Sequence, residues 1–208
     1  MFCVLFEVHP RPERVDAYLD LAQRLRPDLE RIDGFVDVVR YRSLRRDGWI
    51  LSLSTWRDEK ALVRWRVESR HHRAQEQGRT EVFLDYHLRI GAVAQDTRVP
   101  AGQVLSEDRL DTTEVGAATA IVLVDTTRND PATNAAGLVT SDLFEAILAP
   151  GNFLLMATFR DDAHAASFEA VAAPEARARV RRVRVIRDYG MFDRREAPQH
   201  YPEATRQG

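Results

Sequence analysis

The chain has 208 residues, which is enough for one large domain or two small ones. Its 30 basic and 32 acidic side chains nearly cancel, and this balance argues against a protein that binds nucleic acid through charge. The one cysteine, Cys3, excludes an intramolecular disulfide and a multi-thiolate metal site, and no stretch approaches the length of a membrane span. We therefore expect a cytoplasmic protein with no nucleic-acid or membrane partner.

The first half of the chain alternates between strand-like and helix-like patterns. Runs of β-branched and aromatic residues predict strands, and apolar residues at three- and four-residue spacing predict amphipathic helices. Gly34 suits the end of the first helix, and Asp58 suits the cap of the second. In chain order we expect a strand at 2–8, a helix at 15–32, strands at 35–43 and 49–56, a helix from 59 to about 79, and a strand at 82–93. This βαββαβ order is the ferredoxin-like arrangement.

An internal repeat links the two halves of the chain. The segment STWRDEKALVRW at 54–65 aligns without a gap with ATFRDDAHAASF at 157–168. In this alignment Trp65 meets Phe168, and at the same offset Tyr86 meets Tyr189. The repeat predicts a second ferredoxin-like unit.

The second unit is the shorter of the two. A strand at 118–127 and a hairpin at 143–159 fit the pattern, but they leave room for only a few helical turns near Pro131–Thr140. We expect an α+β chain of two tandem ferredoxin-like (βαββαβ) units. Its parts are the first domain at 1–94, a linker at 95–117, a degenerate second domain at 118–193 and a polar, arm-like C-terminal tail at 194–208.

The first unit resembles the antibiotic biosynthesis monooxygenase (ABM) domain family of the dimeric α+β barrel superfamily, over almost all of residues 2–93. The resemblance rests on IDGFVDVVRYRS at 32–43, on LSLSTWRDEKALVRW at 51–65, and on the segment with His71, Gln75, Gly78 and Arg79. It implies two ferredoxin-like sheets packed into a barrel, usually from two chains. Here the tandem unit would supply the partner sheet, giving an intrachain dimeric α+β barrel. A further homodimer of this pseudo-dimer stays open.

Trp65, His71 and His72 form the candidate catalytic group. Family members carry a Trp in this helix and often a His six positions later, which correspond to Trp65 and His71. In an unbroken helix His72, seven positions after Trp65, would share its face, whereas a break near Glu68–Ser69 would favour His71. Both histidines stay open, with His71 ranked first. Trp65 fits a core anchor as well as the wall of a pocket.

Five further residues are candidates for substrate binding: Trp56, Tyr86, Glu7, His9 and Arg89. Trp56 holds the place of the family's Trp at the end of the third strand, and Tyr86 could line the same pocket. Glu7 and His9 share one face of the first strand, and Arg89 lies in the fourth. Charged residues at such positions are more often edge or surface groups. No spacing of His, Cys, Asp and Glu predicts a metal site.

The resemblance implies a monooxygenase that oxidises an electron-rich small aromatic molecule, such as an anthrone or a quinol, with O2 and without a cofactor. Trp65 would align the planar substrate, and His71, neutral near pH 7, would act as the base. Certain oxygenases of the family carry an Asn one helical turn before the Trp, where this chain has Ala61, so another polar group must steady the substrate. The alternatives are a haem-binding or haem-degrading relative, and a non-catalytic barrel that binds a small apolar molecule.

Overall fold

The computed structural model describes residues 1–105, 110–129, 134–172, 179–201 and 204. In those residues the strands are β1 (Phe2–Pro10), β2 (Phe35–Ser43), β3 (Ile50–Trp56), β4 (Phe83–Asp96), β5 (Ala120–Thr126), β6 (Leu138–Ala146), β7 (Phe153–Phe159) and β8 (Arg179–Gly190). The helices are α1 (Val15–Glu30), α2 (Glu59–Val67), α3 (Ser69–Gln77) and α4 (Asp162–Ala172). A 3-10 turn (Pro12–Arg14) precedes α1, and a π-helical turn (Gly78–Val82) follows α3.

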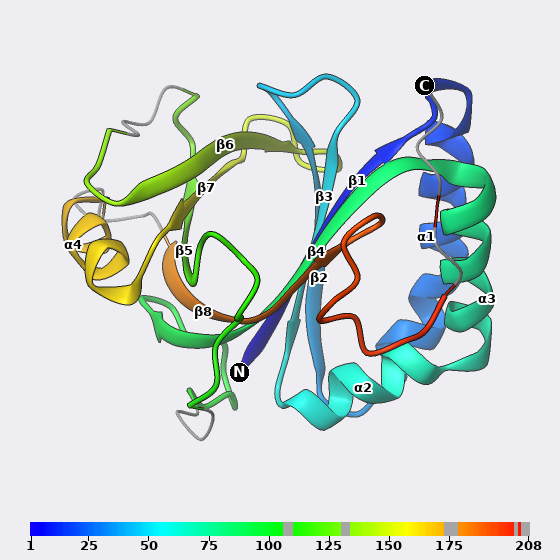
Figure 1. Ribbon diagram of the computed structural model, residues 1–208, viewed down its shortest axis with the longest axis horizontal. Coiled ribbons are helices and arrows are strands. Elements are labelled where there is room, and N and C mark those ends of the chain that lie inside the picture. Colours follow the sequence, from blue (N-terminus) through cyan, green and yellow to red (C-terminus); the bar gives the residue numbers. More distant parts are fainter. Residues whose placement is uncertain (106–109, 130–133, 173–178, 202–203, 205–208) are drawn as a thin grey trace.

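The strands form a closed barrel in the order β1-β3-β2-β6-β7-β5-β8-β4. Each half contributes the same internal order, β4-β1-β3-β2 from the first and β8-β5-β7-β6 from the second. Antiparallel pairing of β2 with β6 and of β4 with β8 joins the two sheets at both edges (Figure 1). The α+β fold class and the intrachain α+β barrel are therefore confirmed.

The alternation of side chains along β1 separates the barrel interior from the outer face of the sheet. Cys3 and Leu5 belong to the buried cluster inside the barrel, where they meet apolar residues of the second half such as Phe144. The intervening Val4 and Phe6 pack on the opposite face, among the residues that the helices cover. The first sheet is thus buried on both faces, and only its outer face meets helices.

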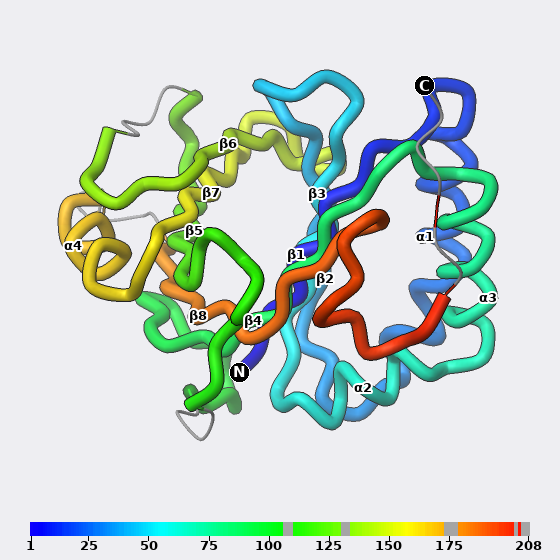
Figure 2. The backbone as a smooth tube through the Cα atoms, in the orientation of Figure 1, coloured from blue at the N-terminus to red at the C-terminus, as the bar shows by residue number. Residues whose placement is uncertain are grey.

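Helices cover the outer face of each sheet. α1, α2 and α3 lie over the first sheet, and α4 lies over the second, at the far side of the molecule (Figure 1). The residues that follow β8 turn back toward the helices of the first half (Figure 2). The expectation of an arm-like tail is therefore wrong for residues 194–201, because Arg194 and Gln199 bond to residues of the first unit. Within the described ranges, no helix combines the length and apolarity that crossing a membrane requires.

Two expected helices differ from the structure. The helix expected from 59 to about 79 is divided at Glu68 into α2 and α3, because the Glu68 side chain caps the start of α3. In the second unit, Thr140 lies in β6, where it pairs with Thr158 of β7, so the helix expected near Pro131–Thr140 does not extend to that residue. The beginning of that expected helix, up to residue 133, lies outside the described residues.

Candidate active site

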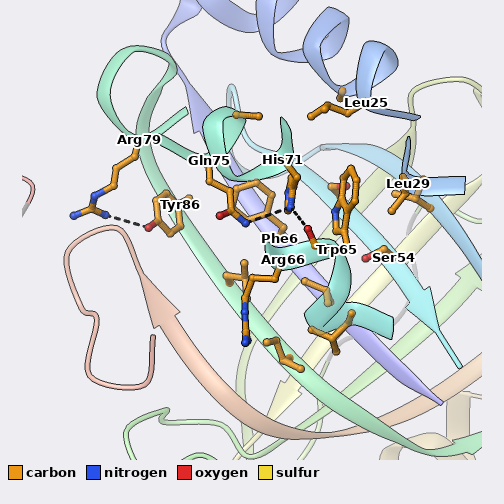
Figure 3. Close-up of a pocket in the computed structure, with 18 of the residues that line it drawn as sticks. Phe6, Leu25, Leu29, Ser54, Trp65, Arg66, His71, Gln75, Arg79 and Tyr86 are labelled. Atoms are coloured by element: carbon orange, nitrogen blue, oxygen red, sulfur yellow. Dashed lines mark hydrogen bonds between the residues drawn. The ribbon is translucent and has the colours of Figure 1, made fainter. Parts of the chain in front are cut away.

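A pocket lies between the outer face of the first sheet and the helices that cover it. It encloses about 200 Å³. Its floor comes from β1, β2, β3 and β4, its walls from α1, α2 and α3, and residues after β8 close one side. Apolar side chains such as Phe6, Leu25 and Leu29 make up much of its surface (Figure 3). The first unit therefore supplies most of the lining.

A break between α2 and α3 sets the geometry of the candidate catalytic group. Glu68 has an extended backbone (φ −60°, ψ 133°), and its carboxylate accepts a 2.8 Å hydrogen bond from the backbone N–H of His71. This cap starts α3 in a new direction. The imidazole of His71 then stacks on the indole of Trp65, with ring centroids 4.1 Å apart and an interplanar angle of 14°. Of the two arrangements left open by the sequence, the structure has the broken helix, with His71 and Trp65 both lining the pocket (Figure 3).

The hydrogen bonds of His71 indicate which ring nitrogen carries the proton. Nδ1 lies 2.8 Å from the carbonyl oxygen of Trp65, which can only accept, so Nδ1 is the protonated nitrogen of the neutral ring. The amide nitrogen of Gln75 lies 3.4 Å from Nδ1, too far to compete with that bond. Nε2 of His71 is consequently free of a proton. Burial lowers the pKa of His71 to about 4, although the Trp65 carbonyl and Glu68 oppose the shift, so the ring is neutral at pH 7.

Trp56 lies at the end of β3 and lines the floor of the pocket. Its side chain is almost fully buried, and its indole N–H donates to Ser54 Oγ at 2.9 Å. Phe35 packs edge-on against its ring, with centroids 5.5 Å apart. These contacts fix the indole as part of the core as well as of the pocket surface.

Ala61 of α2 packs against Gly34 in the loop before β2. It is fully buried, and a side chain added to Gly34 would come within 2.6 Å of its Cβ. Gly34 has φ +94°, a conformation that suits glycine. A larger residue at position 61 would separate the two segments, so polar contacts to a substrate must come from elsewhere in the pocket.

The hydroxyl of Tyr86 lies at one end of the pocket between two guanidinium groups. Arg79 Nη1 donates to it at 3.1 Å, and Arg194 Nη1 donates to it at 2.6 Å. Arg79 also donates to the carbonyl of Met191 at 2.9 Å, which ties the π-helical turn before β4 to the segment after β8. Tyr189, the counterpart of Tyr86 in the repeat, lines the same end.

Glu7 and Arg89 lie on the other face of the sheet, inside the barrel. Both are almost fully buried and form an ion pair, so the reading of them as surface charges is wrong. Burial alone would raise the pKa of Glu7, but the charges of Arg89 and Arg46 outweigh burial and hold it below its ordinary value. His9 also lies away from the pocket and stacks on Trp49 at 5.3 Å. The structure therefore separates these three candidates from Trp65 and His71.

The described part of the C-terminal tail covers one side of the pocket. Gln199 Nε2 donates to Gln75 Oε1 at 3.0 Å, and the Tyr201 hydroxyl donates to the same oxygen at 3.2 Å. Tyr201 also stacks on His72, with centroids 5.9 Å apart. His72 is exposed and does not line the pocket.

Several pocket residues were not found by reasoning from the sequence. Arg194, Gln199 and Tyr201 lie more than 120 positions after Trp65 and belong to no motif, so only the fold brings them to the site. Arg66 stands next to Trp65 but has the appearance of an ordinary charge on an exposed helix face. Arg79 carried a signal, because it belongs to the segment on which the family resemblance rests.

Comparison with known proteins identifies the family. A family model described as antibiotic biosynthesis monooxygenase matches residues 1–77. Jasmonate monooxygenase ABM of Pyricularia oryzae is 43% identical over 222 residues, which cover 99% of this chain and 100% of that protein. The chain belongs to the antibiotic biosynthesis monooxygenase family. The resemblance seen in the first unit is thus confirmed, and the fungal relative extends it over the second.

Solved structures give more distant likenesses. A crystal structure of an antibiotic biosynthesis monooxygenase is 17% identical and covers 43% of this chain and 95% of its own, with a TM-score of 0.39. An anthrone oxidase-like protein is 10% identical and covers 95% of this chain and 96% of its own, with a TM-score of 0.40. At these values neither likeness bears on the substrate.

Proposed function

We propose that the chain is a monooxygenase that oxidises a small, mostly apolar molecule in the first-unit pocket, without a cofactor. The observation that carries this proposal is the stacked pair of Trp65 and His71 on the pocket wall. His71 presents an unprotonated nitrogen, and the apolar surroundings keep bulk water from competing for the substrate's proton. Trp65 has one face covered by His71, so the rest of the indole would contact the substrate.

An electron-rich aromatic molecule with an acidic C–H group, such as an anthrone, suits a base of this kind. His71 would take a proton from the methylene carbon, and the resulting carbanion would give electrons to O2 and form a C–OOH bond. Loss of water from this hydroperoxide leaves a ketone, so CH2 and O2 become C=O and H2O. The substrate supplies all four electrons. The indole of Trp65 would stabilise the imidazolium formed in the first step through its π face.

A jasmonate-like substrate is the second candidate, because the relative that matches the whole chain is a jasmonate monooxygenase. Jasmonate is an apolar carboxylate without an aromatic ring. Converting one of its C–H groups and O2 into an alcohol and water takes two further electrons and two protons. A reduced nicotinamide or a similar two-electron donor would have to supply them.

Oxygen uptake by the purified protein tests the proposal and separates the candidates. The panel contains anthrones, hydroquinones and jasmonic acid, each with and without NADPH. We expect uptake with an anthrone in the absence of NADPH, with one ketone formed for each O2. Uptake only with jasmonic acid and NADPH would favour the second candidate instead. Absence of uptake with every compound would contradict the proposal and favour a non-catalytic barrel, and a Soret band in the purified protein would indicate haem.

A further inference from the structure

The charged residues that line the pocket are arginines. They come from four different elements, and no aspartate or glutamate among the described residues lines the pocket. Arg40 lies at the β2 side, next to the hydroxyl of Tyr18. The other three, Arg66, Arg79 and Arg194, gather at the end formed by β4, β8 and the C-terminal tail. This end of the pocket is therefore positively charged.

Arg66 and Arg194 lack a carboxylate partner within the described part of the chain. The Nε atom of Arg66 is buried and makes no hydrogen bond there. Burial raises the pKa of Tyr189 to about 12, and the nearby charge of Arg66 opposes this rise. Arg194 lies over the ring of Tyr189 at 5.6 Å, so both cations adjoin the same tyrosine. Partly buried cations without an anion are costly, and an anionic ligand would relieve that cost.

Arg89, inside the barrel, and Arg46, in the loop between β2 and β3, both have carboxylate partners. Arg89 and Arg46 both pair with the carboxylate of Glu7, and Arg46 pairs with Asp142 as well. The fold therefore supplies a carboxylate to the buried Arg89 on the inner face of the sheet. Among the described residues it supplies none to Arg66 and Arg194 on the pocket face.

The hydroxyl group of Tyr86 can also donate a hydrogen bond at this end of the pocket. Its oxygen accepts from Arg79 and Arg194, and these two bonds occupy both lone pairs (Figure 3 shows the first). The O–H proton then has no acceptor among the residues that the structure describes, although the side chain is only 9% exposed. A buried donor polarised by two guanidinium groups binds an anionic oxygen most strongly.

We propose that this end of the pocket binds the carboxylate of an apolar organic acid, with Arg66, Arg194 and the Tyr86 hydroxyl as its donors. The inference rests on the proposed function, since it takes this pocket as the substrate site. The apolar body of the acid would extend over Phe6 toward Trp65 and His71. The carboxylate would then determine which carbon atom faces the base. An aromatic substrate of this enzyme would likewise carry a carboxylate substituent.

The affinity of the wild-type protein for matched acids and esters tests this inference directly. Isothermal titration would compare jasmonic acid with methyl jasmonate, and 2-naphthoic acid with methyl 2-naphthoate. We expect each acid to bind about 10- to 100-fold more tightly than its ester, because charge-assisted hydrogen bonds are lost in the ester. Equal affinity of acid and ester in both pairs would overturn the inference without any change to the protein.

Three variants test which residues bind the carboxylate of the acids. Tyr86→Phe and Arg66→Gln should each weaken binding of the acids about tenfold and binding of the esters less than twofold. Arg64→Gln is the matched control, because Arg64 lies on the same helix, is exposed, pairs with Asp33 and does not line the pocket. It should leave both affinities unchanged. Equal weakening of acid and ester by Tyr86→Phe and Arg66→Gln would count against carboxylate recognition.

Oxygen uptake keeps the two proposals distinguishable. If the acids bind selectively and no compound is oxidised, the proposed function fails and the carboxylate site stands. If neutral compounds are oxidised as efficiently as their carboxylated counterparts, the carboxylate site fails and the proposed function stands.

Discussion

The imidazole of His71 lies flat on the indole of Trp65, with ring centroids 4.1 Å apart, although six positions separate the two residues. In a continuous α-helix, residues six positions apart point about 120° away from each other. The extended backbone of Glu68 removes this mismatch, because it ends α2 and allows α3 to begin in another direction. The proposed catalytic pair therefore depends on the interruption between α2 and α3 at Glu68.

The cap formed by Glu68 should matter for activity as well as for stability. Glu68→Ala removes the acceptor of the His71 N–H bond, so we expect about 1 kcal/mol lower stability and a decrease of about tenfold in kcat/KM as the ring shifts. Asp58→Ala is the matched control, because Asp58 caps α2 through the N–H of Ala61. It should cost a similar free energy of unfolding and change kcat/KM less than twofold. Equal losses of activity in the two variants would show that the His71 position does not depend on Glu68.

The buried imidazole of His71 should make the folded chain sensitive to acid. Its pKa is lowered from 6.5 to about 4 on folding, so between these values the unfolded chain binds a proton that the folded chain does not. The group has no effect above pH 6.5, and the free energy of unfolding falls by up to roughly 3 kcal/mol as the pH drops toward 4.

Urea unfolding at pH 7 and pH 4.5 measures this loss. His71→Gln, which does not titrate, should lose less stability between the two pH values than the wild type. His72→Gln changes an exposed histidine and should keep the wild-type dependence. An unchanged dependence in His71→Gln would mean that the ring is not held in its neutral form.

Replacement of Trp65 should separate its contribution to binding from its contribution to packing. Trp65→Phe should weaken substrate binding but keep the fold, because Phe168 fills the equivalent place in the second unit and packs against Phe159. Trp65→Ala should in addition lower the free energy of unfolding by about 3 kcal/mol. Titration calorimetry and thermal melts distinguish the two effects. Trp49→Phe, the same change outside the pocket, serves as control, and equal loss of affinity there would contradict the role of Trp65.

The ion pair inside the barrel should support the fold but not the site. Glu7→Gln removes the ionised partner of Arg89, so we expect a loss of about 3–5 kcal/mol in the free energy of unfolding. Substrate affinity should stay unchanged, because the pair lies on the opposite face of the sheet from the pocket. Asp33→Asn breaks an exposed pair with Arg57 and should cost much less, because solvent screens the charges of that pair. A marked change in substrate affinity in Glu7→Gln would place the functional site elsewhere.

The barrel could be predicted from the sequence because the patterns that indicate its strands and helices are local and occur in both halves. Strand-like runs, helical spacing and the match of 54–65 with 157–168 are all patterns of neighbouring residues. The break at Glu68 was harder to decide, since it depends on whether one carboxylate caps a helix or faces solvent. The family position of His71 indicated the break, whereas helical geometry alone favoured His72.

The burial and position of several charged residues could not be predicted from the sequence. Glu7 and Arg89 looked like surface groups because nothing in β1 or β4 tells which face a second sheet will cover. Their burial depends on pairing across the barrel, which is a long-range property. Arg194 came to the pocket in the same way, from a tail whose composition is polar throughout.

The most direct test of the central claim is the turnover of an anthrone by His71→Ala beside His72→Ala, measured by oxygen uptake. His71 lines the pocket, and its neighbour is exposed outside it. We expect His71→Ala to lower kcat by about 10²- to 10⁴-fold, because it removes the proposed base, while a melting curve checks that the variant is folded at the assay temperature. His72→Ala should retain the wild-type rate. Full activity in His71→Ala, or loss of activity in His72→Ala alone, would contradict the assignment of His71 as the base.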